Sequence, residues 1–231
     1  MKKYCVALWA VCVLFSLTGM AGEQLSTKPE KKDFGRHEGF VKIAKQGGVD
    51  LLFLGDSITD GWRGGGKAVW DKNFLPLKAA NFGISGDKTE HVLWRLQNGE
   101  LEGIQPKLAV IMIGTNNVGR DSAGDIADGV KAIVKELQTK TPQTKILLLA
   151  IFPRSPKPDK TRAKLQETNE IIAKLDDGKN LKYLDIGDKF MDADKNIPKD
   201  IMPDALHPNA KGYEIWADAI IGPVKEMMGE K

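Results

Sequence analysis

Cysteine is nearly absent from this 231-residue sequence, and histidine is scarce. The two cysteines, Cys5 and Cys12, lie in an N-terminal segment that we expect to be cleaved, which would leave the mature chain with none. A disulfide, a thiol nucleophile and a thiolate metal site are then excluded. Only three histidines are available as a general base that titrates near neutral pH.

The sequence also lacks an excess of charge of one sign. It has 34 Lys and Arg against 31 Asp and Glu, and the formal charge of +3 falls to +1 once Lys2 and Lys3 are removed with the N-terminal segment. The lysines are interspersed with acids, as in Lys31-Lys32-Asp33, so we expect a mixed solvated surface and no nucleic-acid partner. Internal repeats and low-complexity tracts are missing too.

The N-terminal segment has the pattern of a secretory signal peptide. Lys2 and Lys3 precede an apolar stretch over residues 6–17 and small residues up to Ala21. The stretch has about a dozen residues, whereas a helix needs roughly 20 to span a bilayer, so no stable membrane anchor is expected. We predict a signal peptide over 1–21, a flexible leader over 22–34 and one domain over 35–231, in a secreted or periplasmic protein.

Five short apolar segments predict buried β-strands. They are continuously apolar, as strands covered on both faces must be, and segments with apolar residues at helical spacing lie between them. We therefore predict an α/β fold, a three-layer α/β/α sandwich with a five-stranded parallel sheet. We expect the last helix over 209–228, with Pro223 bending or shortening its end. The predicted strands are residues 50–54, 79–82, 108–113, 146–151 and 181–186.

Polar motifs follow the first three of these strands. Parallel strands bring such motifs to one edge of the sheet, where ligands bind. A serine hydroxyl needs a base to accept its proton and donors for the resulting oxyanion. We predict Ser57 as the nucleophile and its own amide, Gly86 and Asn116 as the oxyanion hole. The motifs are Gly55-Asp56-Ser57, Gly83-Ile84-Ser85-Gly86 and Gly114-Thr115-Asn116-Asn117.

The base is predicted to be His207. Asp204 stands three residues before it, in Asp204-Ala205-Leu206-His207-Pro208, where a carboxylate can orient the imidazole and stabilise its protonated form. His91 lies in a helical segment and His37 precedes the first strand, and we interpret both as structural. The sequence therefore predicts a catalytic triad of Ser57, His207 and Asp204 that works through an acyl-enzyme.

Two further sequence patterns resemble ligand-binding motifs, but each lacks residues that the motif requires. Residues 61–67 fit the start of a phosphate-binding loop, but Ala68 stands where a Ser or Thr should bind Mg²⁺. Residues 192–196 imitate a Ca²⁺ loop, yet Ile197 replaces the turn glycine and Pro203 the closing acid. We interpret the first as a flexible loop beside the active site and the second as a surface turn, and predict no metal.

Four residues next to the motifs are candidate substrate contacts. Trp62 and Arg63 lie in the glycine-rich loop that follows Ser57, and Asp56 and Asn117 adjoin the predicted nucleophile and oxyanion donor. For Asp56, hydrogen bonding within the loop is the alternative. The roles of the sequence's tryptophans, core or pocket wall, stay open at this point.

Together the four polar blocks resemble those of the SGNH, or GDSL, hydrolases. Residues 91–96 and 98–101 are similar to the catalytic subunits of intracellular platelet-activating-factor acetylhydrolase. The resemblance implies a flavodoxin-like sandwich, hydrolysis of short acyl esters and no cofactor. It also implies the same roles for Ser57, Gly86, Asn116, Asp204 and His207. Asn117 stands where many members of the wider family have Asp.

The predicted signal peptide separates this chain from the intracellular enzymes. We therefore expect a secreted serine esterase, a carboxylic ester hydrolase that removes acetyl groups from carbohydrate. An acetylhydrolase or lipase acting on phospholipid-like esters is one alternative. A non-catalytic carbohydrate-binding module that retains the fold is the other. The sequence leaves the oligomeric state open.

Overall fold

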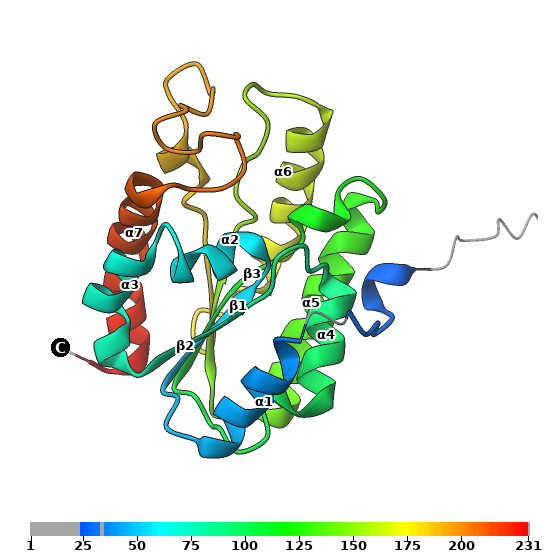
Figure 1. Ribbon diagram of the computed structural model, residues 1–231. Coiled ribbons are helices and arrows are strands. Elements are labelled where there is room, and N and C mark those ends of the chain that lie inside the picture. Colours follow the sequence, from blue (N-terminus) through cyan, green and yellow to red (C-terminus); the bar gives the residue numbers. More distant parts are fainter. Residues whose placement is uncertain (1–23, 33–34, 231) are drawn as a thin grey trace, which may run out of the picture.

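One parallel β-sheet forms the centre of the molecule in the computed structural model, which describes residues 24–32 and 35–230 (Figure 1). The strand order is β2-β1-β3-β4-β5, and every pairing is parallel. The predicted five-stranded α/β fold is confirmed, and each predicted strand lies within two residues of an observed one. The strands are β1 Leu51–Gly55, β2 Ala79–Gly83, β3 Leu108–Met112, β4 Lys145–Leu149 and β5 Leu181–Leu184.

Helices cover both faces of the sheet (Figure 1). One face carries α1 (His37–Gln46), α4 (Thr89–Arg95), α5 (Ala123–Lys140) and α6 (Lys160–Ile172). The other carries α3 (Lys67–Asn73) and α7 (Ala210–Met228), while the short α2 (Ser57–Asp60) follows β1 directly. Figure 1 shows α3 and α7 on the side of the sheet opposite α1, α4 and α5.

Successive strand residues point to opposite faces and enter two different cores. In β1, Leu52 and Leu54 face a largely aliphatic core, while Leu51 and Phe53 face a core rich in aromatic rings. All four side chains are at most 1% exposed. Burial on both faces explains why the strands are continuously apolar in sequence.

Three strand ends bring the polar motifs together. Gly55 at the end of β1 pairs with Gly83 of β2 on one side and with Met112 of β3 on the other. The loops that begin after these residues therefore emerge side by side at one edge of the sheet. This edge holds the candidate site.

Helix α7 (Ala210–Met228) begins and ends within one residue of the predicted range 209–228. Asn209 caps it by accepting a hydrogen bond from the Gly212 amide at 3.1 Å. Pro223 lies inside the helix, which continues to the predicted end at Met228, so of the two expected effects of Pro223, bending or shortening, shortening is not observed. Within the residues that the structure describes, no helix combines the length and apolar character needed to cross a membrane.

The segment before α1 differs from the flexible leader that we expected. Residues 24–32 contain a 3₁₀ turn, η1 (Leu25–Thr27), that packs against α4 and α5. Ser26 is fully buried, and Gln24 Nε2 donates a hydrogen bond to Asp128 at 2.8 Å. This part of the predicted leader belongs to the folded body. The predicted signal peptide over 1–21 lies outside the described residues.

Candidate active site

The turn between β1 and α2 places Ser57 at the edge of the sheet. Gly55 is required there, because a Cβ would lie 2.1 Å from Thr59 Oγ1 and 2.5 Å from the Met112 carbonyl oxygen. The Asp56 carboxylate caps α2 by accepting from the Ile58 amide at 3.0 Å. Ser57 is the first residue of the helix, so its own amide has no acceptor in the preceding turn.

A continuous chain of hydrogen bonds joins Ser57, His207 and Asp204. Ser57 Oγ lies 2.9 Å from His207 Nε2, and His207 Nδ1 lies 2.6 Å from Asp204 Oδ2. The other Asp204 oxygen accepts from the amides of Leu206 and His207 at 3.0 and 2.7 Å. A base within reach of a hydroxyl, with a carboxylate orienting the base, is the arrangement needed for nucleophilic catalysis.

Asn116 is hydrogen-bonded to the loop that contains Gly86, through the residue that follows Gly86. Asn116 Nδ2 donates one hydrogen bond to the Asp87 carbonyl at 2.8 Å, and the amide carries a second N–H that can donate to a ligand. Gly86 adopts a left-handed conformation with φ of 76°, which favours glycine. Arg154 steadies the Asn116 loop by donating from Nη1 to the Thr115 carbonyl at 3.1 Å. Hydrogen bonds thus join Ser57, His207 and Asp204 to one another, and a separate hydrogen bond joins Asn116 to the Gly86 loop at the same edge of the sheet.

A buried ionic network lies behind the Gly86 loop, and sequence reasoning missed it. Arg95 Nε donates to Asp87 Oδ2 at 3.0 Å, its Nη2 donates to the Phe82 carbonyl at 3.0 Å, and its Nη1 contacts Glu100. The residues Asp87, Arg95 and Glu100 are at most 1% exposed. His37 Nδ1, 3.1 Å from Glu100, extends the network. The resemblance motif contained Arg95 and Glu100, but nothing in the sequence connected them to Asp87.

Asn117 is buried and points away from the site, which corrects its interpretation as a substrate contact. Its Nδ2 donates to Thr89, Glu90 and Asp121 at 3.1, 3.0 and 2.8 Å. Its Oδ1 accepts from the Thr89 amide at 3.1 Å. The side chain therefore ties the Asn116 loop to the start of α4.

Trp62 is also too deeply buried to contact substrate. Its side chain is 1% exposed, and its ring centroid lies 4.5 Å from that of Tyr213 and 4.8 Å from that of Trp216. It is a core residue of the aromatic face. Arg63, the next residue, does line the pocket beside Ser57.

Asp56 is a buried carboxylate, and its bond from the Ile58 amide supports the alternative of hydrogen bonding within the loop over a substrate contact. Its side chain is fully buried, and Oδ2 has no hydrogen-bond donor among the described residues. Burial raises the pKa of Asp56 to about 7, against a smaller opposing effect of the Ile58 amide. For Asp204, burial raises the pKa, but the amide and imidazole of His207 outweigh it, and the net pKa is lowered.

A pocket of about 480 Å³ opens beside Ser57 and His207. Its charged residues are Arg36, Asp60 and Arg63, and both arginines form ion pairs with Asp60. Ser85, Tyr213 and the glycines 61, 64 and 65 complete much of its wall. The surface beside the nucleophile is therefore polar and mostly free of bulky aliphatic side chains.

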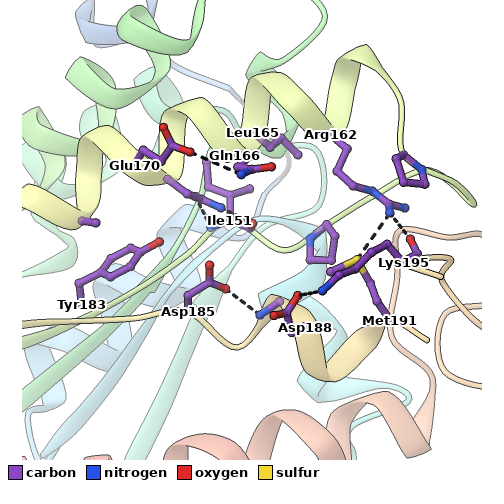
Figure 2. Close-up of a pocket in the computed structure, with 15 residues that line it drawn as sticks. Ile151, Arg162, Leu165, Gln166, Glu170, Tyr183, Asp185, Asp188, Met191 and Lys195 are labelled. Carbon is purple, nitrogen blue, oxygen red and sulfur yellow. Dashed lines mark hydrogen bonds and ion pairs between the residues drawn. The ribbon is translucent and has the colours of Figure 1, made fainter. Parts of the chain in front are cut away.

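A second pocket, of about 550 Å³, lies between α6 and the loop after β5 and contains none of the predicted site residues (Figure 2). Its cations are already engaged. Lys195 Nζ donates to Asp188 at 2.9 Å, and Arg162 donates from Nε to the Arg154 carbonyl at 3.0 Å. Figure 2 shows Arg162 directed toward Lys195 and Met191. No motif in the sequence marks this pocket.

In the part of the chain that the structure describes, one group of three potential metal ligands occurs. Glu30, Glu90 and His91 bring ligand atoms within 4.8 Å of one another. Glu90 is already paired with Arg120 at 2.7 Å, and His91 Nδ1 accepts from the Lys88 amide at 3.0 Å. Glu90 and His91 therefore already have hydrogen-bond or ion-pair partners within the protein. This agrees with the interpretation of His91 as a structural residue.

The chain is similar in sequence to a family of known ester hydrolases. The model of the GDSL-like lipase/acylhydrolase family matches residues 53–215. The alpha2 subunit of platelet-activating factor acetylhydrolase IB from Homo sapiens is 41% identical over 179 residues, which cover 77% of each chain. The human alpha1 subunit is 39% identical over 178 residues, covering 77% of this chain and 76% of that one.

Solved structures share the same fold. A GDSL-like lipase from Bacteroides thetaiotaomicron aligns with a TM-score of 0.68 and 18% identity, covering 84% of this chain and 99% of that one. A catalytic mutant of Axe2, an acetylxylan esterase from Geobacillus stearothermophilus, aligns with a TM-score of 0.62 and 20% identity, covering 80% and 96%. At these identities the likeness establishes the fold alone.

Proposed function

The chain belongs to the GDSL-like lipase/acylhydrolase family and is a carboxylic ester hydrolase, and we propose that it removes acetyl groups from carbohydrate with Ser57 as nucleophile. The observation that carries the proposal is the hydrogen-bonded chain from Ser57 Oγ through His207 to Asp204, at 2.9 and 2.6 Å. This chain of hydrogen bonds supplies a nucleophile and an oriented base for acyl transfer, whereas a carbohydrate-binding module needs neither.

The first half of the reaction forms an acyl-enzyme. Ser57 Oγ attacks the ester carbonyl while His207 Nε2 takes its proton, and Asp204 stabilises the resulting imidazolium through Nδ1. The amides of Ser57 and Gly86 and the free N–H of Asn116 are the proposed donors to the oxyanion. Collapse of this intermediate breaks the bond to the alcohol, which leaves with the proton from His207.

The second half regenerates the enzyme. Water attacks the acyl carbonyl while His207 Nε2 again accepts a proton, and the same donors hold the second oxyanion. Ser57 then leaves as the hydroxyl by taking that proton back, and the free acid departs. Every proton transfer uses one imidazole nitrogen, so the mechanism calls for His207 to begin each half-reaction neutral.

The lining of the Ser57 pocket supports a small acyl group on a hydrophilic alcohol. Arg36, Asp60, Arg63 and Ser85 offer polar groups to sugar hydroxyls, and the glycines leave space beside them. A long acyl chain would need an extended apolar surface there. The Axe2 neighbour is an acetylxylan esterase, which agrees with this proposal.

A phospholipid-like acetyl ester is the second candidate, because the human relatives at 41% and 39% identity are platelet-activating factor acetylhydrolase subunits. Purified enzyme can be assayed with acetylated xylo-oligosaccharides, acetylated monosaccharides and acetyl phospholipid. We expect the highest kcat/KM on the oligosaccharides. A preference for the phospholipid would replace the substrate while leaving the chemistry in place.

Covalent labelling tests the chemistry itself. A fluorophosphonate probe should label the wild-type chain at Ser57, and the variant Ser57→Ala should neither be labelled nor hydrolyse p-nitrophenyl acetate. An unlabelled wild-type protein would favour a non-catalytic carbohydrate-binding module. Hydrolysis by Ser57→Ala at the wild-type rate would remove Ser57 from the proposed role.

We also propose that the protein is secreted or periplasmic, on the basis of the signal-peptide pattern in residues 1–21. N-terminal sequencing of protein recovered outside the cytoplasm should find a chain that starts near residue 22. Recovery of the full-length chain from the cytoplasm alone would contradict this localisation.

A further inference from the structure

Residues 24–32 lie outside the stretch that matches the family model, yet they contact the loops of the candidate site. The Ser26 carbonyl accepts a hydrogen bond from Thr89 Oγ1 at 2.9 Å, and the Glu30 amide donates to the Glu90 carbonyl at 3.2 Å. Both partners begin α4, directly after the Gly86 loop. This segment therefore packs against the scaffold of the proposed oxyanion hole.

Gly129 of α5 makes the close packing of Ser26 possible. A Cβ on Gly129 would lie 2.7 Å from the Ser26 carbonyl oxygen and 2.4 Å from Thr89 Oγ1. The amide of Thr89 in turn donates to Asn117, the neighbour of Asn116. The segment thus reaches the Asn116 side of the site through two hydrogen bonds.

Lys32 reaches the Gly86 side directly. Its Nζ donates to the Ser85 carbonyl at 2.7 Å and lies 3.4 Å from Asp87 Oδ1. The side chain is 17% exposed, so water screens the contact only in part. A Cβ on Gly86 would lie 2.8 Å from Nζ, which shows how closely the ammonium group approaches this residue.

The Ser85 carbonyl and the Gly86 amide belong to one peptide group. That group is planar, and the structure has no cis peptide bond in the described residues, so its N–H points opposite to its C=O. A cation bound to the carbonyl oxygen therefore fixes the direction of the Gly86 N–H. It also withdraws electron density from the amide and strengthens the N–H as a donor, because hydrogen bonds in a chain polarise one another.

We propose that Lys32 is a positioning residue for ester hydrolysis, which orients and polarises the Gly86 amide as an oxyanion donor. The inference rests on the proposed function, in which that amide binds the oxyanion. It makes the N-terminal segment part of the catalytic unit, although the family model begins at residue 53. Because the oxyanion exists only after attack, Lys32 acts on kcat and leaves ground-state binding of the ester nearly unchanged.

The test uses substitutions at two adjacent lysines in the full chain. Lys32→Met removes the ammonium and keeps most of the aliphatic stem, whereas Lys32→Arg keeps a cation that can donate to the Ser85 carbonyl. Lys31→Met is the matched control, since Lys31 lies over the Trp94 ring with Nζ 5.8 Å from its centroid. Ser57→Ala is included as a test of the proposed function.

With p-nitrophenyl acetate, we expect Lys32→Met to lower kcat by roughly 10- to 100-fold with KM within about twofold of wild type. Lys32→Arg should recover most of the activity, and Lys31→Met should behave as wild type. Thermal unfolding, measured in parallel, should show Tm values within a few degrees of wild type for all three, because Asp87 keeps its hydrogen bond from Arg95 at 3.0 Å. A lower kcat at a nearly unchanged Tm separates a positioning role from a folding defect.

The role of Lys32 and the proposed function would be overturned by different results. Wild-type kcat in Lys32→Met, with Ser57→Ala inactive, would overturn the role of Lys32 and leave the proposed function intact. Equal losses in Lys31→Met and Lys32→Met would also overturn it, because the effect would then follow the charge of the segment. Full activity of Ser57→Ala would overturn the proposed function instead.

Discussion

The two halves of the candidate site differ in their exposure to solvent and in the sequence separation of the residues that form them. The acid–base half, Asp204 and His207, is exposed, with side chains 56% and 42% accessible, and lies in one four-residue turn. The oxyanion half, the loops of Gly86 and Asn116, rests on the buried ions Asp87 and Arg95. Its contacts join residues that are distant in the sequence.

The difference predicts how substitutions separate activity from stability. An exposed ion pair contributes little to folding, so substitutions in the acid–base half should lower activity strongly and stability only slightly. A buried ion that loses its partner is costly, so substitution of the buried ions behind the oxyanion loops should lower stability as well as activity.

The largest effect on turnover is expected in the acid–base half. His207→Ala removes the only base within hydrogen-bond distance of Ser57 Oγ in the described residues, and should lower kcat by roughly 10³- to 10⁶-fold. The Tm should stay within a few degrees of wild type, because the side chain is half exposed. Initial rates and differential scanning calorimetry on the same sample measure both quantities. A large fall in Tm would show that this half is structural too.

The largest effect on stability is expected at Arg95. Arg95→Met removes the cation that the buried carboxylates Asp87 and Glu100 share and leaves Asp87 with the longer Lys32 contact at 3.4 Å, so it should destabilise the fold by roughly 3–5 kcal/mol. This corresponds to a Tm lower by roughly 6–20 °C for a chain of this size. Lys195→Met, which breaks an exposed pair with Asp188, is the control and should cost under about 1 kcal/mol. Equal Tm values for the two variants would contradict the comparison.

Asn116→Ala distinguishes the loss of an oxyanion donor from the loss of the buried ions that support its loop. The variant loses one proposed oxyanion donor, so kcat should fall by roughly 10²- to 10³-fold with little change in KM. It also loses the hydrogen bond to the Asp87 carbonyl, worth roughly 1 kcal/mol, so the Tm should fall only slightly. A rise in KM at constant kcat would instead assign Asn116 to ground-state binding.

Asp56 gives the smallest predicted effect, on the pH dependence of stability. Its pKa is about 7 in the folded protein against an ordinary value of 3.8, so between these values the native state binds more protons than the unfolded state. The contribution of Asp56 to the free energy of unfolding is therefore lost as the pH rises from its ordinary pKa to its pKa in the folded protein. Asp56→Asn preserves a helix cap and removes the titration, and should be more stable than wild type at pH 8 by roughly 1–3 kcal/mol.

Urea unfolding at pH 4, 6 and 8 measures this difference, which should shrink toward pH 4. Asp204→Asn is the control with the opposite sign, since its lowered pKa supplies stability above its ordinary value that is lost as pH falls. A pH-independent difference between Asp56→Asn and wild type would show that the Asp56 carboxyl does not titrate in this window.

The sequence predicted the sheet well because the strands are buried on both faces. Residues 51–54 and 108–112 are apolar without interruption, and helical spacing marked the residues of α5 that contact the sheet. Ser57, Asp204 and His207 were predicted because each follows a strand end or precedes a helix in a short motif. Trp62, Asp56 and Asn117 were misjudged because proximity in sequence to a site does not decide which way a side chain points.

The sequence by itself determined the order of the strands along the chain, the pairing of Asp204 with His207 across three residues, and the chemistry available to Ser57. Only the tertiary structure decided which residues hold the oxyanion loops. Arg95 meets Asp87, and Lys32 meets Ser85, through contacts between elements that local propensity and periodicity do not encode. Packing of α4 and the N-terminal segment on the sheet creates those contacts, because each buried charge there must find a partner far along the chain.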